Sequence, residues 1–341
     1  MAGRKIGIDP GSMNLKLFLG NRNVVITEKD MIALGRKKTV TAAGNAAYEM
    51  FERTSNRVSI SSPVCQGVIT DAGQLTKVTE AVLKKNGISS GLISNFHFYI
   101  AVPGDVSEVE KRAYYNFIAH SAYSTRNIFM VEKAVAAAAG DGLPLSESAP
   151  FMLVDMGAGS TEISVLKGGG LVLSRMLREG GNTINDNIRR MVDEQHGLLI
   201  GWKTSEFMKF ELGSAAPAGS ASMTAYGRDR VSGLPRGEKI SVELIFKAMR
   251  EYFIHVMREV HAMLAAIPSE MVAPILDRGI YFTGGVCDIP GLRDLFASIL
   301  GVQVHFSKTP SESAVRGLGK IMADPSAYSR VIFTLKDSAF E

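Results

Sequence analysis

Two short turns hold the residues whose types and spacing could do chemistry. The first is Asp9–Ser12 (DPGS) and the second is Asp155–Ser160 (DMGAGS), and each follows an apolar segment. Successive backbone amides in such turns form an anion-binding nest, and glycine lets a phosphate approach the backbone closely. The two serine hydroxyls add donors, while the two aspartates are suited to hold Mg²⁺ through its water shell. Either turn alone could be a hairpin without a ligand, but the pair predicts a grip on a nucleotide polyphosphate from two sides.

A third glycine turn, Thr283–Gly285 (TGG), also follows an apolar segment. Its glycines would let a flat adenine and its ribose lie against the backbone, although a Gly-Gly pair after a strand is often only a tight turn. The motifs of other nucleotide-binding classes are absent from the sequence: there is no P-loop, no dinucleotide-binding fingerprint and no kinase signature. The histidines form no H-E-x-x-H metal motif.

The elements that must position these turns follow an α/β pattern, because apolar runs alternate with helical patterns. Residues 5–26 and residues 151–176 share one order: strand, Asp-x-Gly turn, strand, glycine-containing turn, strand. This recurrence predicts an internal duplication, with two related lobes that face each other across a shared cleft. Residues 108–122 are expected to form a helix with a capping box at Ser107 and Glu110, and 134–140 a helix of small residues that permits close packing. The loop at 140–150 is the candidate domain boundary.

Length and composition limit the possible classes of protein. The 341 residues exceed twice the usual length of one domain, which favours two lobes. With 46% hydrophobic and 21% charged residues, the chain is neither disordered, collagenous nor a coiled coil. A net charge of +4 does not indicate a nucleic-acid partner, and none is expected. Cys65 and Cys287 form no metal spacing and no disulfide framework, which suits a reducing cytosol. No apolar run approaches the roughly 18 residues that span a bilayer.

The motifs carry a family resemblance. D-x-G-x-x-N at 9–14, VDMGAGSTE at 154–162 and YFTGGVCDIPGL at 281–292 resemble the actin and heat-shock-chaperone ATPase superfamily. More narrowly, the chain resembles the MreB family of bacterial actins over almost its whole length. The segment GRDRVSGLPR at 227–236 is the most specific part of that likeness, since the wider superfamily does not share it.

The resemblance implies an α/β, actin-like ATPase fold with two duplicated lobes around a nucleotide cleft. Lobe I would comprise 1–145 plus 315–341, with a small subdomain at about 33–75, and lobe II would comprise 146–314, with a small subdomain at about 183–245. The resemblance further implies a homopolymer of paired protofilaments at the inner face of the cell membrane. Such filaments determine cell shape by organising the cell-wall (peptidoglycan) elongation machinery, so the expected location is cytoplasmic and membrane-associated.

The resemblance also assigns the residues that hold ATP and Mg²⁺. Asp9 and Asp155 would hold Mg²⁺ through water, and Ser160 would stand at the reacting phosphate. Glu206 and Lys209 lie one helical turn apart and would hold adenosine, although from the residues alone they could be a surface ion pair. The full set of expected ATP contacts is Asp9, Gly11, Ser12, Met13, Asn14, Lys16, Asp155, Gly157, Ala158, Gly159, Ser160, Thr161, Glu206, Lys209, Gly284 and Gly285.

The chain departs from the family most consequentially at Lys133. MreB proteins have a glutamate here that orients the water attacking the γ-phosphate. An ammonium group has three donors and no acceptor, so it cannot play that part, and hydrolysis is expected to be slow. A shift of one residue in register would instead let Glu132 serve, which would make the chain a competent ATPase. Lys16 is a second departure and suggests a plasmid-segregating actin as the alternative function, and Asn182 stands where the family usually has aspartate.

Membrane contact is predicted at the loop that contains Leu92 and Ile93. Two apolar side chains beside Lys84 and Lys85 are typical of an interfacial anchor. The same two residues could equally begin the next strand or pack on the lobe.

Overall fold

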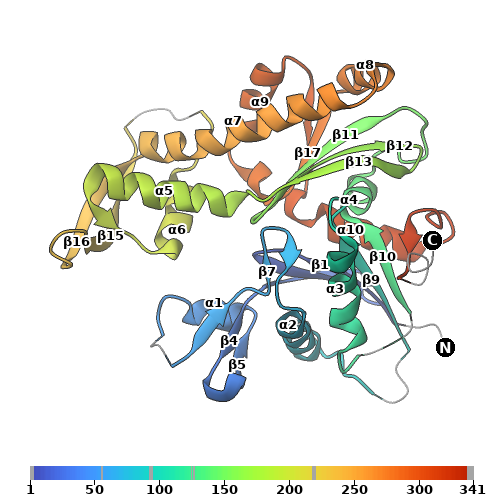
Figure 1. Cartoon of the computed structure of the whole chain (residues 1–341), viewed down its shortest axis with the longest axis horizontal. Coiled ribbons are helices and arrows are strands. Elements are labelled where there is room, and N and C mark those ends of the chain that lie inside the picture. The colour runs from blue at the N-terminus through green and yellow to red at the C-terminus, as the bar shows by residue number, and fades with distance from the viewer. Residues whose placement is uncertain are drawn as a thin grey trace.

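The computed structural model describes residues 4–335 apart from 55–56, 92–94, 124, 126 and 217–219. Two large sheets form the centre of the molecule, each with helices against it (Figure 1). The first has the order β19-β10-β9-β1-β2-β3. Its strands are β1 (Arg4–Pro10), β2 (Asn14–Leu19), β3 (Val24–Lys29), β9 (Phe96–Val102), β10 (Ile128–Glu132) and β19 (Ile332–Phe333).

The second large sheet repeats this plan with the order β13-β12-β11-β17-β18. Its strands are β11 (Phe151–Met156), β12 (Thr161–Lys167), β13 (Gly170–Leu177), β17 (Ile280–Thr283) and β18 (Val304–Phe306). In both sheets three strands form an antiparallel meander, and the first of them pairs in parallel with a strand from later in the chain. The duplicated α/β lobes predicted from the sequence are therefore confirmed.

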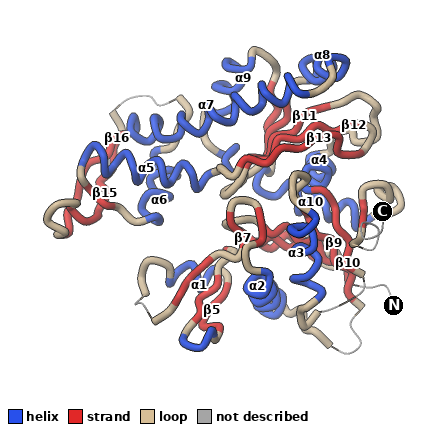
Figure 2. Tube along the Cα trace, viewed as in Figure 1, coloured by secondary structure: helices blue, strands red, loops and turns tan. Residues whose placement is uncertain are grey.

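A small unit is attached to each large sheet, and the two units lie on the same side of the molecule (Figure 2). One contains β4 (Ile32–Leu34), η1 (Arg36–Lys38), β5 (Val40–Ala43), α1 (Asn45–Met50) and β6 (Ser59–Ser61). The other contains α5 (Gly181–His196), β14 (Leu198–Leu199), α6 (Trp202–Leu212), β15 (Ser222–Asp229) and β16 (Pro235–Ser241). We propose the lobe and subdomain limits given above, because β19 returns the C-terminal segment to the first sheet.

The remaining elements cover the sheets or connect them. They are the hairpin β7 (Val64–Cys65) and β8 (Val68–Ile69), the helices α2 (Ala72–Lys85), α3 (Glu108–Ala119), α4 (Lys133–Asp141), α7 (Val242–Ala266), α8 (Ser269–Arg278), α9 (Leu292–Leu300) and α10 (Ser313–Ala323), and the turns η2 (Gly285–Asp288) and η3 (Pro310–Glu312). α3 has its expected capping box, in which Ser107 and Glu110 each accept a hydrogen bond from the other's backbone N–H. Within the described residues, no helix has the length and apolar character needed to cross a membrane.

α4 and α10 pack between the two large sheets. They share one hydrophobic cluster with side chains of both sheets, including Tyr99 from the first and Phe151 from the second. The helices approach so closely that a Cβ on Gly317 would overlap the carbonyl oxygen of Ala136, and one on Gly140 would overlap that of Ser313. The run of small residues at 134–140 thus permits close packing, as expected.

Candidate functional site

The cleft between the large sheets contains two adjoining cavities of about 100 and 190 Å³. Both phosphate turns line the first cavity, because each turn follows a strand at the centre of its sheet. The second cavity lies toward the small units and is lined by Glu206, Lys209 and Asn182. The cavities share Met13, Asn14, Ala158 and Gly285, so one elongated ligand could occupy both.

The two phosphate turns touch each other across the cleft. A Cβ on Gly159 would overlap the hydroxyl of Ser12, so only glycine permits this approach. The β7–β8 hairpin closes the cavity from the side, where the Gly67 N–H donates to Ser12 Oγ at 3.2 Å. A Cβ on Gly67 would lie 2.6 Å from Ser160 Oγ, which brings that hairpin against the second turn as well.

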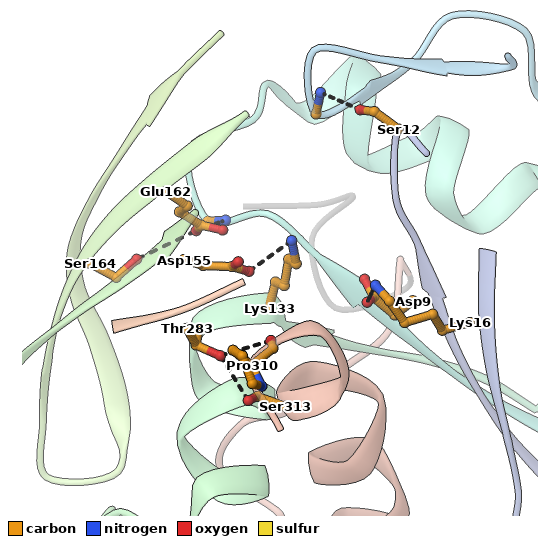
Figure 3. Close-up of polar contacts among 12 residues, drawn as sticks. Asp9, Ser12, Lys16, Lys133, Asp155, Glu162, Ser164, Thr283, Pro310 and Ser313 are labelled. Atoms are coloured by element: carbon orange, nitrogen blue, oxygen red, sulfur yellow. Dashed lines mark hydrogen bonds and ion pairs between the residues drawn. The ribbon is translucent and has the colours of Figure 1, made fainter. Parts of the chain in front are cut away.

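Two ion pairs dominate the charge of the first cavity (Figure 3). Lys16 Nζ lies 3.0 Å from Asp9 Oδ2, and Lys133 Nζ lies 2.8 Å from Asp155 Oδ2. Burial alone raises the pKa of Asp9, yet the ammonium groups of Lys16 and Lys133 hold it below its ordinary value. Burial alone would lower the pKa of Lys133, but Asp155 and Asp9 raise it above its ordinary value. Lys133 therefore carries a full charge at neutral pH.

Lys133 reaches the cavity because it is the first residue of α4, directly after β10 of the first sheet. Its ion pair with Asp155 joins the two large sheets (Figure 3). Glu132 is not among the residues that line the cavity, and Lys111 on α3 is the charged group that acts on it. Burial raises the pKa of Glu132, with Lys111 opposing the shift.

Glu206 and Lys209 do not form the exposed ion pair that was the alternative expectation. Glu206 is buried and accepts a hydrogen bond of 2.6 Å from the Tyr48 hydroxyl. Lys209 donates to the carbonyl oxygen of Gly181 at 2.9 Å, at the start of α5. Burial, opposed by the attraction of Glu206 and reinforced by nearby Lys29, lowers the pKa of Lys209 to about 8.

The two small units contact each other through a group of residues that we call the α1–α6 latch (Tyr48, Glu52, Trp202 and Lys203). The Glu52 carboxylate accepts from the backbone N–H groups of Trp202 at 2.6 Å and Lys203 at 3.0 Å. It thereby caps the N-terminus of α6 from the other lobe. Lys203 Nζ donates to the Tyr48 carbonyl oxygen at 2.5 Å and lies 4.4 Å from that tyrosine's ring centroid.

The third glycine turn also lines the cleft. Gly284 has a φ of 88°, and a Cβ there would overlap the carbonyl oxygen of Met156. Only glycine therefore fits between the second phosphate turn and η2. Thr283 is fixed below it by a hydrogen bond from its hydroxyl to Ser313 Oγ at 2.7 Å (Figure 3).

Some expected site residues lie elsewhere, and some lining residues were missed. Thr161 is fully buried outside both cavities, where its hydroxyl lies 2.6 Å from the Tyr252 hydroxyl. Gly67 and Glu162 line the first cavity without having been singled out. A Gln-Gly pair between two short apolar pairs is a hairpin signal that could have identified the first. The membrane prediction for Leu92 and Ile93 lies outside the described residues.

Comparison with known proteins agrees with this architecture. The family described as MreB/Mbl protein matches residues 3–330. The chain is 31% identical over 330 residues to the cell shape-determining protein MreB of Escherichia coli K12, covering 94% of each. It is also 31% identical to the cell shape-determining protein Mbl of Bacillus subtilis 168, covering 94% of this chain and 96% of that one.

Solved structures give the same result. MreB 5 of Spiroplasma citri bound to AMPPNP superposes with a TM-score of 0.89 at 26% identity, covering 97% of this chain and 99% of that one. A MamK double helical filament superposes with a TM-score of 0.79 at 20% identity, covering 95% of this chain and 99% of that one. This comparison shows likeness of fold. With a family match that spans almost the whole sequence, the chain belongs to the MreB/Mbl family and has the actin-like fold.

Proposed function

We propose that this chain binds ATP in the cleft and assembles into filaments that act in determining cell shape. One observation carries the proposal: two glycine turns from separate sheets meet over one cavity, and a nucleoside-sized cavity continues from it. The backbone amides of the turns would cradle the phosphates, and Glu206 with Lys209 would hold the nucleoside. The AMPPNP-bound relative, which superposes over 97% of the chain, supports this assignment.

Thermal unfolding and electron microscopy test this function. ATP at about 100 times its Kd should stabilise the folded protein by about 2.7 kcal/mol through mass action. Electron micrographs of the purified protein with ATP should show filaments. If millimolar nucleotide leaves the melting temperature unchanged and no filaments form, the proposal is wrong.

We further propose that the filaments are paired protofilaments that bind the inner face of the membrane and organise the cell-wall elongation machinery. The names of the Escherichia coli and Bacillus subtilis relatives, both cell shape-determining proteins, support this reading over plasmid segregation. Lipid vesicles added to the microscopy sample should become decorated with filaments. Bare vesicles beside abundant filaments would contradict the membrane proposal while leaving assembly intact.

ATP hydrolysis is proposed to be slow because Lys133 lies at the phosphate cavity and Glu132 does not. Lys133→Glu should raise phosphate release by at least tenfold, within the usual range for a positioned base. Phosphate release from filaments, measured with a coupled colorimetric assay, gives the rate. Glu132→Ala is the matched control and should change the rate little. The opposite outcome is that Lys133→Glu releases phosphate no faster than the native protein and Glu132→Ala abolishes release. Glu132 would then be the residue that orients water.

The Mg²⁺ site implied by the resemblance does not fit the residues of this cleft. Asp9 and Asp155 are the carboxylates that would hold the hydrated ion, and each is already paired with an ammonium group. The ammonium groups of Lys16 and Lys133 therefore stand beside these carboxylates, and they are cations that the cleft presents to a nucleotide phosphate.

A further inference from the structure

We propose that Lys133 and Lys16 replace the divalent cation, so that this chain binds nucleoside di- and triphosphates without Mg²⁺. The inference rests on the proposed nucleotide-binding function and names the ionic form of the ligand. Both ammonium groups lie in the first cavity, between the carboxylates that would otherwise hold a hydrated Mg²⁺ ion.

The charge balance of the cavity favours a bare polyphosphate over its Mg²⁺ complex. Asp9 and Asp155 pair one to one with Lys16 and Lys133, so these four groups sum to zero. Glu162 also lines the cavity, where burial raises its pKa and its carboxyl oxygen accepts from the Gly104 N–H and the Ser174 hydroxyl. A divalent cation beside either carboxylate would also lie beside an ammonium group, and like charges repel strongly where water is partly excluded. The side chains of Lys133 and Lys16 are only 20% and 14% exposed, so solvent screens this repulsion weakly.

The hydrogen-bond donors of the two lysines can link a carboxylate to a phosphate, which is the part that a hydrated Mg²⁺ ion would otherwise play. An ammonium group has three hydrogens. Lys133 gives one to Asp155 and Lys16 gives one to Asp9, which leaves two on each for phosphate oxygens. Hydrogen bonds between charged groups are short and strong, and here they would link each carboxylate to the phosphates through an ammonium ion.

The two lysines come from different parts of the fold, which lets them flank a phosphate chain. Lys16 lies on β2 directly after the first phosphate turn, and Lys133 lies at the start of α4. Lys133 reaches the base of the second turn through Asp155, as Figure 3 shows. A β- or γ-phosphate held between the turns would therefore have one ammonium group on each side.

Calorimetry on nucleotide-stripped protein tests the inference directly. ADP and a non-hydrolysable ATP analogue are titrated in excess EDTA and again in excess Mg²⁺, below the concentration at which filaments form. We expect the Kd in EDTA to be lower than in Mg²⁺, or higher by no more than about threefold. A Kd in EDTA raised beyond threefold would overturn the inference while leaving nucleotide binding established. No binding under either condition would instead remove the proposed function.

Substitutions at Lys133 assign the effect to its ammonium group. Lys133→Glu should bind at least tenfold more weakly in EDTA than in Mg²⁺, because a carboxylate then faces the phosphates in place of an ammonium group. Lys133→Met keeps the length of the side chain without its charge. Its Kd should also be higher in EDTA than in Mg²⁺, but by a smaller factor. Lys77→Glu makes the same charge reversal on the exposed face of α2 and should behave as the native protein does. If Lys133→Glu binds equally well in both solutions, Lys133 does not replace the cation.

Discussion

At the scale of single residues, Asp30 is the buried group that no contact described above uses. It lies between β3 and β4, is 0% exposed, and neither carboxylate oxygen has a hydrogen-bond partner within the described structure. Its backbone N–H donates to the carbonyl oxygen of Met13 at 2.9 Å, so it lies directly behind the first phosphate turn. Burial raises the pKa of Asp30 to about 8, because the charged form loses its hydration.

Asp30→Asn should stabilise the protein, and increasingly so as the pH rises. Between the unfolded pKa of 3.8 and the folded pKa of about 8, the folded state binds more protons than the unfolded state, so stability falls with rising pH. The gain from the amide should therefore be small near pH 4 and reach a few kcal/mol above pH 8. Urea denaturation across this range measures it, with exposed Asp277→Asn as the control. An equal gain at every pH would mean that Asp30 does not titrate in this window.

The sequence identifies Lys16 and Lys133 as departures from the family but does not predict their partners. The phosphate turns could be predicted because apolar strand, aspartate, glycine and serine follow one another locally. The Lys133–Asp155 pair could not, because it joins the start of α4, after the first sheet, to β11 of the second sheet. The contact of Glu206 could not be predicted for the same reason, because its partner Tyr48 lies on the opposite small unit.

At the scale of elements, the α1–α6 latch joins the small units next to Glu206 of the second cavity, and we expect it to limit how readily that cavity opens. Glu52 adopts a left-handed backbone conformation with a φ of 61°, which is uncommon for a residue other than glycine. This strain is held by the two backbone hydrogen bonds that its carboxylate accepts from α6. Local sequence patterns do not reveal such a contact, since the capping residue lies 150 positions before the helix that it caps.

Glu52→Ala should speed nucleotide release by roughly 5- to 30-fold. Removing a capping carboxylate costs about 1–2 kcal/mol, and here that cost falls on the closed form of the cleft. A stopped-flow chase of a fluorescent ATP analogue measures the release rate. Glu49→Ala removes a nearby exposed carboxylate that pairs with Arg53 across 3.7 Å, and it should have no effect. Equal rates in all three proteins would show that the latch does not limit release.

At the scale of the whole molecule, the close crossing of α4 and α10 unites the two lobes. Their shared hydrophobic cluster draws side chains from both large sheets, in addition to the separate core cluster that each lobe has. The helix of small residues was predictable from the sequence, and so was its close packing. Its partner was not, because α10 follows some 170 residues later and carries only Gly317 and Gly319 as a signal.

Gly317→Ala should destabilise the protein by about 3 kcal/mol or more. The added Cβ would overlap the carbonyl oxygen of Ala136, and neither backbone can move without disturbing the shared cluster. Chemical denaturation gives the free energy of unfolding. Gly170→Ala is the control, because a Cβ there would have no atom within 4 Å. A loss no greater than that of the control would show that the crossing can relax.

α4 can also be considered as a lever. Its nine residues span about 13 Å, with Lys133 in the cleft at one end and Gly140 at the crossing near the other. Asp141 anchors that far end by accepting hydrogen bonds from Ser307 and Ser313. If loss of a phosphate displaced the ammonium group by about 1 Å, a rigid rod of this length would turn by about 5° about the crossing. The outer edges of the lobes, several times farther from that axis, would then move several times farther than the ammonium group itself.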